Sequence, residues 1–185
     1  MAPPSPQPVA VADSDAALIA AWQRGDERAA AELVRRHAKS LARFLAGAGG
    51  ASGEIDDLVQ ESFIRAFRGL DRFRGQCRFR TWLFTIGGNV LRDAGRKAGR
   101  GRAVPLAEDL RDTAGDPHDL AVAGEVERRL QEGLSRLPRM QREVFLLRAQ
   151  QGLEYEEIAA ALDTSPGAAR VHYHHAVRRL KEYVQ

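Results

Sequence analysis

Apolar side chains recur along most of this chain at the spacing of amphipathic helices. The clearest stripe lies on one face of a helix with about 3.6 residues per turn, and it consists of Ile55, Leu58, Val59, Phe63, Ala66, Phe67 and Leu70. Similar but shorter stripes occur within residues 18–22, 33–45, 83–91, 126–137, 140–147, 158–162 and 169–184. No segment alternates between apolar and polar residues as a strand does. The pattern therefore predicts an all-α protein.

Turn-forming residues divide these helices. The acidic and hydroxyl side chains at 13–15 offer an N-cap for the first helix, and the glycine-rich run 47–53 predicts a flexible loop after the second. Gly87 and Gly88 lie inside the helix that begins near Arg80, where each costs about 1 kcal/mol relative to alanine in an exposed helix. These glycines indicate either a local weakness or a close approach of the backbone to a partner.

The last two predicted helices form a helix-turn-helix candidate. The first spans about 154–162, and a tight turn follows in which Ser165 can cap the next helix and Pro166 can occupy its first position. That helix runs to about Val184, and the face opposite its apolar stripe carries Arg170, Val171, His174, His175, Arg178 and Lys181. Because none of these side chains is acidic and most can donate hydrogen bonds, we expect the helix to enter the major groove of DNA. A solvated face at the end of a bundle is the alternative.

Charge is unevenly distributed, although the net charge is only +3. Residues 65–102 contain eleven Arg or Lys and two Asp, whereas residues 103–132 contain eight acidic residues and three Arg. A basic block beside an acidic one favours a polyanion-binding surface next to a linker that avoids it. We therefore predict two small helical domains joined by a flexible acidic linker, with a disordered tail at 1–12, a first domain at 13–100, the linker at 101–118 and a second domain at 119–185.

The composition argues against a secreted or membrane protein. The single cysteine, Cys77, rules out an internal disulfide and a cysteine-rich zinc site. No apolar run approaches the roughly 18 residues of a membrane span. The proline- and alanine-rich start also lacks the basic and apolar regions of a signal peptide. We therefore expect a cytoplasmic protein.

The sequence also argues against an enzyme. A hydrolase would need clustered carboxylates on a metal, or a nucleophile beside a base. The acidic cluster at 56–61 lies on a solvated helix with no second cluster to complete a site, and His37 and His118 are isolated. We predict no catalytic residue, no cofactor and no small-molecule substrate.

Several segments together resemble the extracytoplasmic-function (ECF) sigma factors of bacterial RNA polymerase. Residues 57–66 (DLVQESFIRA), 79–83 (FRTWL) and 89–93 (NVLRD) resemble conserved region 2, and residues 137–147 followed by 155–159 (YEEIA) resemble region 4. The resemblance extends from about Leu18 to Leu180 in the order expected for the family. It implies an initiation factor that binds core RNA polymerase, directs it to promoter DNA and melts the −10 region. It also implies control by an anti-sigma factor.

The resemblance assigns roles to residues of the first domain. The face formed by Asp57, Gln60 and Glu61 matches the surface that docks on the coiled-coil clamp of the largest polymerase subunit, and the alternative is a solvated helix face. The basic segment matches the part that contacts the −10 element, through Arg74, Arg78, Arg80, Trp82, Asn89, Arg92, Arg96 and Lys97.

Melting the −10 region requires the protein to offset lost base stacking. Melting costs about 1.4 kcal/mol per base-pair step, and stacking a base on an aromatic side chain returns about 1–3 kcal/mol. The candidate aromatics are Phe73, Phe79, Trp82 and Phe84. Spacing turns Phe79 inward, whereas Trp82 belongs either to the core or to a stacking platform.

In the second domain the resemblance implies recognition of the −35 element by Ser165, Arg170, Val171, His174, His175 and Arg178. The recognition helix departs from the family, because residues 168–173 read AARVHY where many relatives carry Thr-Val-Lys/Arg-Ser-Arg-Leu/Ile, and His175 replaces an expected basic side chain. Promoter preference is therefore not transferable. His172 and His175 lie one helical turn apart, but no carboxylate or cysteine joins them, so we predict no metal site.

The alternative function is a stand-alone helix-turn-helix regulator that binds duplex operators without polymerase. It explains the second domain and leaves the first unexplained. Under the favoured interpretation, the two domains are held apart so that one binds duplex DNA while the other captures separated strands.

Overall fold

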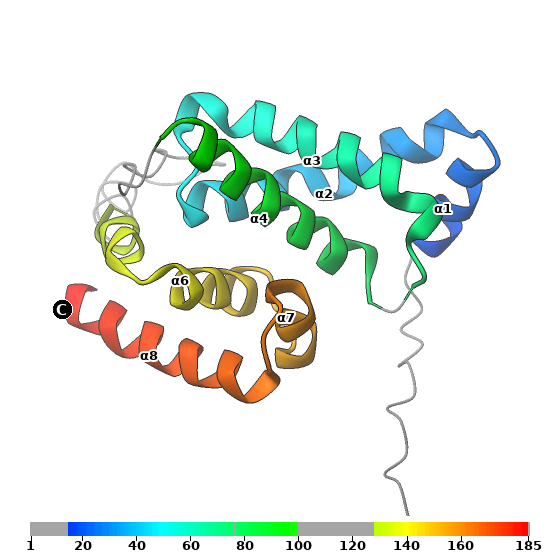
Figure 1. The fold of residues 1–185 in the computed structure, drawn as a ribbon. Coiled ribbons are helices and arrows are strands. Elements are labelled where there is room, and N and C mark those ends of the chain that lie inside the picture. Colours follow the sequence, from blue (N-terminus) through cyan, green and yellow to red (C-terminus); the bar gives the residue numbers. More distant parts are fainter. Residues whose placement is uncertain (1–14, 76, 100–127, 185) are drawn as a thin grey trace, which may run out of the picture.

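The computed structural model describes residues 15–75, 77–99 and 128–184, and every regular element within these ranges is a helix (Figure 1). The all-α prediction is confirmed. An N-terminal domain comprises the described residues up to 99, and a C-terminal domain comprises residues 128–184. The predicted tail at 1–12 and the predicted linker at 101–118 lie outside the described residues.

The first two helices are α1 (Ala16–Gln23) and α2 (Glu27–Ala48). The side chain of Asp26 caps α2 by accepting a hydrogen bond of 3.0 Å from the Arg28 N–H. Gly49 ends the helix in the left-handed conformation, with a φ of 110°. Helix α2 therefore includes the first two residues of the predicted loop 47–53, because the left-handed turn that stops it occurs at Gly49.

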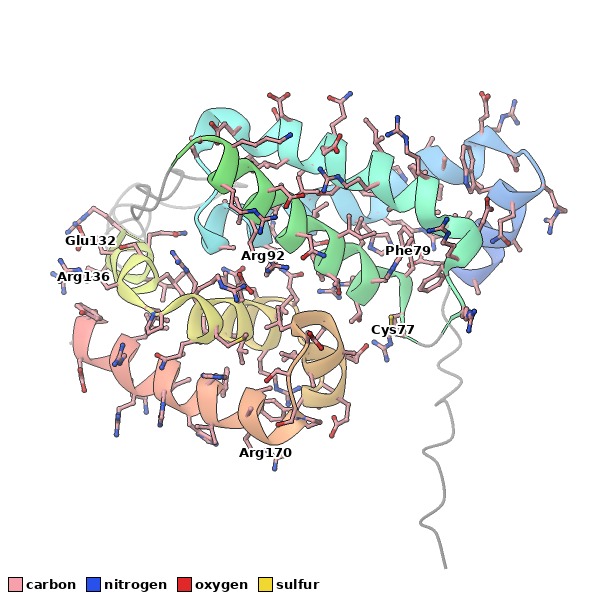
Figure 2. All side chains as sticks on the ribbon, in the orientation of Figure 1. Cys77, Phe79, Arg92, Glu132, Arg136 and Arg170 are labelled. Atoms are coloured by element: carbon pink, nitrogen blue, oxygen red, sulfur yellow. The ribbon has the colours of Figure 1, made fainter. Side chains whose placement is uncertain are left out.

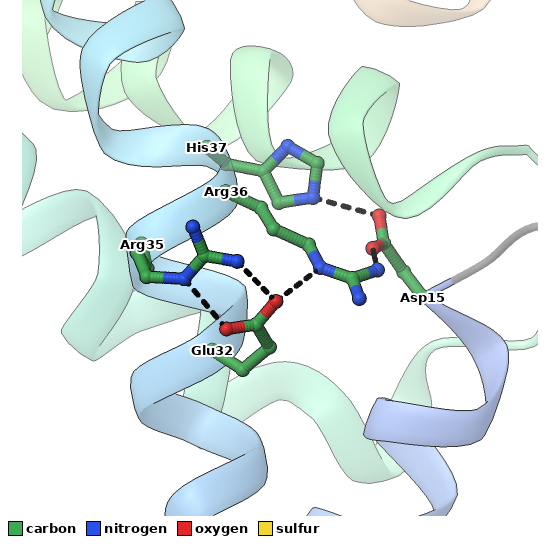
Figure 3. Close-up of polar contacts among 5 residues, drawn as sticks. All are labelled: Asp15, Glu32, Arg35, Arg36 and His37. Carbon is green, nitrogen blue, oxygen red and sulfur yellow. Dashed lines mark hydrogen bonds and ion pairs between the residues drawn. The ribbon is translucent and has the colours of Figure 1, made fainter.

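Asp15 occupies the N-cap position of α1, within the stretch 13–15 that the sequence offered, but its side chain makes no capping hydrogen bond. Its carboxylate is buried instead, 2.7 Å from Nε2 of His37 and 3.2 Å from Nη1 of Arg36 (Figure 3). Glu32 continues the network by accepting hydrogen bonds of 2.7 Å from Arg35 and from Arg36. This network ties the start of α1 to the middle of α2, and it gives His37, which appears isolated in the sequence, a carboxylate partner.

The network predicts a pH-dependent contribution of Glu32 to stability. Hydrogen bonds from Arg35 and then Arg36 lower the pKa of Glu32 from 4.5 to about 2. Since the pKa is lower in the folded state, this contribution is present above pH 4.5 and is lost as the pH falls towards 2. We expect wild type to have a slightly higher Tm than Glu32→Gln near neutral pH, and this difference to shrink in acid. Thermal unfolding of both proteins across that range checks this, and a constant difference in Tm would contradict it.

The other helices of the N-terminal domain are α3 (Ile55–Gly69) and α4 (Phe79–Lys97). Short 3₁₀ turns flank α3 at Ser52–Glu54 and Leu70–Arg72. The predicted stripe of α3 is confirmed, with Ile55, Leu58, Phe63, Ala66 and Leu70 buried and Val59 and Phe67 half-buried. Helices α2, α3 and α4 pack on one another around the fully buried side chains of Leu33, Leu41, Phe44, Phe79 and Leu83.

Gly87 lies where the backbone of α4 packs closely against α2. A Cβ added at this glycine would lie 2.7 Å from Cδ1 of Leu41, which is fully buried. Of the two explanations offered for the glycines inside α4, close approach therefore holds at Gly87. The neighbour is another helix of the same domain.

The C-terminal domain contains helical residues 128–136, α6 (Arg139–Phe145), a π-helical turn at Leu146–Gln150, α7 (Tyr155–Leu162) and α8 (Pro166–Val184). The π turn is closed by a hydrogen bond of 3.2 Å from the Gln151 N–H to the Leu146 carbonyl. Gly152 follows with a φ of 66°. The apolar stripe within residues 140–147 predicted a regular helix in this part of the chain. The π turn shifts the residues after Leu146 relative to that register.

The two domains pack directly against each other. Helix α4 contacts α7, and the C-terminal half of α2 contacts α6 and the π turn (Figure 1). The backbone of Gly47 is so close to Leu146 that an added Cβ would lie 2.7 Å from its Cδ2 atom. The expected arrangement, in which the domains are held apart, is therefore not the one observed. Packing of Leu146 on α2 and polar contacts to α4 hold the domains together.

Candidate nucleic-acid and polymerase interfaces

The turn between α7 and α8 has the geometry of a helix-turn-helix motif. Asp163 ends α7 in the left-handed conformation, with a φ of 52°. The hydroxyl of Ser165 accepts a hydrogen bond of 3.1 Å from the Ala168 N–H, and Pro166 is the first residue of α8. The predicted cap and the predicted start of the helix are confirmed.

Helix α8 presents the outward face that its sequence predicted. Ala169, Ala176 and Leu180 are buried in the domain core. The exposed face consists of Arg170, Val171, His174, His175, Arg178 and Lys181. The valine is 52% exposed, which is unusual for an apolar side chain in this structure. The face is available to a ligand and carries no acidic group from Arg170 to Lys181, and the exposed Glu182 follows in the last turn of α8.

His172 belongs to a different face of α8. It is half-buried, and no hydrogen-bond partner of its Nδ1 lies within the described parts of the chain. His175 is exposed, so the two rings that suggested a metal pair have different surroundings. Among the described residues, no group of three His, Cys, Asp or Glu side chains could hold a metal ion.

Arg170 is held over an aromatic ring. Its guanidinium lies 5.1 Å from the ring centroid of Tyr155 on α7, and that of Arg148 lies 5.0 Å from the same centroid. Arg148 also donates to the Leu153 carbonyl at 2.8 Å and pairs with Glu154 at 2.9 Å, and its hydrogen bond to the Glu154 carboxylate raises the pKa of Arg148. Tyr155 therefore positions the arginine that begins the exposed face of α8, and Figure 2 shows Arg170 on the side of α8 away from the N-terminal domain.

The basic residues predicted to contact −10 DNA lie on α4 and on the segment before it, and they differ in exposure. Arg74, Arg78, Asn89, Arg96 and Lys97 are exposed, whereas Arg80, Trp82 and Arg92 are half-buried. Arg92 also bonds to Asn89, and Arg96 bonds to Asp93. The predicted residues thus lie on α4 or in the segment just before it. Arg96 and Lys97 place two exposed cations at the C-terminal end of the helix.

The candidate aromatics divide between core and surface. Phe79 is fully buried, as predicted, and Phe84 is only 2% exposed, so neither offers a face to a DNA base. Trp82 is half-buried, with its ring centroid 4.9 Å from that of Phe73 and its edge against Gly69. One side of the Trp82 ring thus packs on its own domain while part of the residue stays accessible, and a role in stacking DNA bases stays a prediction.

Three of the predicted DNA-contacting arginines are engaged by the C-terminal domain. Arg80 donates to the carbonyl and to Oε1 of Gln151, at 2.7 and 2.6 Å. Arg78 lies 3.7 Å from Glu157, and Arg92 lies 3.7 Å from Glu143. Figure 2 shows Arg92 on the side of α4 that faces α6.

Sequence reasoning missed these three partners in the C-terminal domain. One signal was available, because Glu143 lies three residues after Met140 and four before Leu147 and so falls on the apolar stripe of its helix. Glu143 is only 3% exposed. A charged residue on a buried face calls for a partner, and Arg139 and Arg92 are those partners.

The predicted polymerase-docking face lies at the start of α3. Asp57 and Gln60 are exposed. Glu61 accepts a hydrogen bond of 2.7 Å from Arg65, which also donates to Asp93 on α4 at 2.8 Å. The hydrogen bonds that Arg65 donates to Asp93 and, with a smaller effect, to Glu61 raise the pKa of Arg65. Asp57 and Gln60 are therefore fully available to a partner, whereas Glu61 also helps to fix α3 on α4.

No helix in the described ranges is both long enough and apolar enough to cross a membrane.

Two family models match the chain. Residues 33–101 match Sigma-70 region 2, and residues 127–180 match Sigma-70, region 4. The ECF RNA polymerase sigma-E factor of Haemophilus influenzae is 32% identical, with 93% of this chain and 96% of that protein covered. The ECF RNA polymerase sigma factor SigD of Mycobacterium tuberculosis is 35% identical, with 91% and 82% covered.

Solved structures agree with these matches. CnrH, solved in complex with the cytosolic domain of CnrY, is 32% identical and superposes with a TM-score of 0.70, covering 92% of this chain and 96% of that one. The sigma factor RpoE of Bartonella quintana, solved with the anti-sigma factor NepR, is 22% identical and superposes with a TM-score of 0.65. The match covers 83% of this chain and 94% of that one, and it shows a shared fold. With both sigma regions present in order and relatives above 30% identity over nearly the whole chain, this protein belongs to the ECF sigma factors of bacterial RNA polymerase.

Proposed function

We propose that this chain binds core RNA polymerase through the start of α3 and engages the −10 region with the basic face of α4. Helix α8 reads the −35 duplex. The observation that carries the proposal is the exposed face of α8, free of acidic groups from Arg170 to Lys181, on a helix-turn-helix in a chain that also matches sigma region 2. The polymerase supplies all the chemistry, and the chain supplies positioning.

The recognition face of α8 supports direct base readout. Arginine can form two hydrogen bonds with guanine, and a valine can pack on a thymine methyl. Arg170 and Val171 are exposed at the N-terminal half of the helix, where recognition helices reach base edges. Ser165, His174, His175 and Arg178 complete the proposed −35 contacts.

The basic face of α4 supports binding to separated strands. Arg74, Arg96 and Lys97 are exposed cations that can track the phosphate backbone. Trp82 and Asn89 offer a partly accessible ring and an amide for an unstacked base. In this proposal Phe84 belongs to the core, and Arg78, Arg80 and Arg92 leave their partners in the C-terminal domain before they contact DNA.

The domain boundaries, the cellular location and a controlling partner also belong to the proposal. We place the −10 and polymerase functions in residues 13–100, the linker at 101–118 and the −35 function in residues 119–185. Since RNA polymerase works in the bacterial cytoplasm, we place the protein there. CnrH is found in complex with a part of another protein, CnrY, and we extend that to this chain as an anti-sigma factor that controls it.

In vitro transcription tests the proposal directly. Purified chain is mixed with core polymerase and a library of genomic fragments from its own organism, and transcript starts are sequenced. We expect a stable complex and a set of starts that share −10 and −35 elements. If no complex forms, or if starts do not change when the chain is added, the proposed function is wrong.

Asp57→Ala is expected to weaken assembly with core polymerase about five- to tenfold, which corresponds to about 1–1.4 kcal/mol. The reason is that Asp57 is an exposed carboxylate on the proposed docking face. Glu27→Ala is the matched control, because Glu27 is also an exposed carboxylate in the first turn of a helix. Fluorescence titration of polymerase measures both affinities, and equal affinities would place the docking surface elsewhere.

A further inference from the structure

Tyr173 lies at the centre of an aromatic cluster in the C-terminal domain, formed by Phe145 on α6, Tyr155 on α7 and Tyr173 on α8. The ring centroid of Tyr173 lies 6.0 Å from that of Phe145, with the two planes at 15°. It lies 6.2 Å from that of Tyr155, with the planes at 71°. Both arrangements are among those that aromatic pairs favour. Tyr173 therefore connects the rings of three helices.

The ring of Tyr155 holds two arginines. The guanidinium of Arg170 lies 5.1 Å from its centroid and that of Arg148 lies 5.0 Å from it. Arg148 is itself anchored, because it pairs with Glu154 at 2.9 Å. The ring that carries Arg170 is thus held between an anchored arginine and the ring of Tyr173.

The aromatic cluster faces the interior of the domain, whereas Arg170 faces outward. Phe145, Tyr155 and Tyr173 are half-buried and pack against the hydrophobic core. Arg170 is exposed. The aromatic cluster therefore leads from the core of the C-terminal domain to the first residue of the face that the proposed function assigns to DNA.

The direction of an arginine side chain matters more for reading a base than for binding a phosphate. Arginine recognises guanine through two hydrogen bonds from a planar group, so the guanidinium must take one orientation. A side chain that is free in water loses conformational entropy when it is fixed in this way. A phosphate contact carries no sequence information and tolerates more orientations. Loss of positioning is therefore expected to lower discrimination between bases more than affinity for DNA in general.

We propose that Tyr173 determines the base specificity of α8 without contacting DNA itself. Its ring fixes that of Tyr155, and the ring of Tyr155 fixes the direction of Arg170. Tyr173 is thus a positioning residue. This inference rests on the proposed role of α8 in reading the −35 duplex.

Three variants separate this role from ordinary core packing. Tyr173→Leu keeps an apolar side chain for the core and removes the ring, whereas Tyr173→Phe keeps the ring. The matched control is Tyr183→Leu. Tyr183 is also on α8 and also lies under an arginine, but that arginine is Arg136, which is outside the proposed recognition face and lies 5.2 Å from the ring centroid. Circular dichroism and thermal unfolding verify that each variant folds.

Base preference is measured by selection from a randomised duplex library with holoenzymes that contain each variant. The position read by Arg170 is defined as the one that Arg170→Ala relaxes. At that position we expect Tyr173→Leu to lower the preference about two- to fivefold, the range for loss of one exposed cation–π contact. We expect unchanged affinity for mixed-sequence duplex. Tyr173→Phe and Tyr183→Leu should match wild type, and Tyr173→Leu should have no further effect at that position in an Arg170→Ala background.

Nuclear magnetic resonance tests the positioning in the free chain, where neither DNA nor polymerase is present. The Nε–Hε signal of Arg170 is identified by its absence from Arg170→Ala. Because a nearby aromatic ring shifts this signal, we expect it to move towards the position of a solvated arginine in Tyr155→Leu and in Tyr173→Leu. It should stay in place in Tyr173→Phe and in Tyr183→Leu.

Three results would overturn the proposal. An Arg170 signal that does not move in Tyr173→Leu would mean that Tyr173 does not hold the ring of Tyr155. A signal that moves while base preference stays the same would mean that the direction of Arg170 does not set specificity. An equal loss of affinity for all sequences would make Tyr173 a core residue only. If Tyr173→Leu does not fold, Phe145→Leu removes the stacked ring from the other side and is judged by the same three results.

Failure of the proposed function would look different. If Arg170→Ala changes the preference at no position, Arg170 does not read the −35 duplex, and that part of the proposed function is wrong. The signal of Arg170 in the free chain would still report whether Tyr173 positions it, because this measurement involves no DNA.

Discussion

Phe79→Ala is expected to lower the free energy of unfolding of the N-terminal domain by about 3–5 kcal/mol, the usual cost of removing a large buried ring. Phe79 is fully buried at the first turn of α4. Its ring centroid lies 5.5 Å from that of His37, 6.1 Å from that of Trp82 and 6.3 Å from that of Phe73. No single neighbour can fill the space left by the ring, so a cavity remains.

Urea denaturation followed by tryptophan fluorescence measures this change in the right domain, because both tryptophans, Trp22 and Trp82, belong to the N-terminal domain. Val171→Ala is the control, since Val171 is 52% exposed on α8 and should change stability by less than about 0.5 kcal/mol. A loss below about 1 kcal/mol for Phe79→Ala would mean that the packing around α4 rearranges freely. The start of α4 would then be a poor platform for Arg80 and Trp82.

Arg170→Ala is expected to weaken binding to the preferred −35 duplex by about 1–3 kcal/mol, which is about ten- to a hundredfold, and to relax the choice of base at one position. Arg170 is exposed near the start of α8, and its guanidinium lies over the ring of Tyr155. This contact holds the side chain before DNA arrives, so little conformational entropy is lost when it binds a base.

Selection from a randomised duplex library, followed by sequencing, measures both affinity and preference for holoenzymes with wild type and with Arg170→Ala. Arg178→Ala serves as a comparison two turns further along the same exposed face. A variant whose affinity falls equally for all sequences has lost a phosphate contact. That result for Arg170→Ala would remove it from base readout and would shift attention to Val171 and His174.

Much of the fold could be predicted from local pattern. The stripe that ends at Leu70 fixed the buried face of α3, and the Ser165-Pro166 pair fixed the start of α8. These features depend on residues within a few positions of each other, so spacing alone reveals them. The exposed side chains of α8 follow in the same way, because they are opposite a stripe that the domain must bury.

Features that depend on distant partners were not predictable. Asp15 has the type and place of an N-cap, but its carboxylate pairs with His37, 22 residues away. The π turn that brings Gln151 to Arg80 has no recognisable sequence signal, and the hydrogen bond it allows joins residues 71 positions apart. Gly47 was assigned to a loop, although it is where Leu146 packs on α2.

The sequence by itself determined that this protein is a set of amphipathic helices with a helix-turn-helix at its C-terminal end and a basic α4. Periodicity and charge are both visible in residues that lie close together along the chain. Only the tertiary structure decided which of those basic side chains pair with groups of the C-terminal domain. Glu143 and Glu157 meet Arg92 and Arg78 because two domains pack against each other. The contact is set by shape and by charges that are close in space but far apart along the chain.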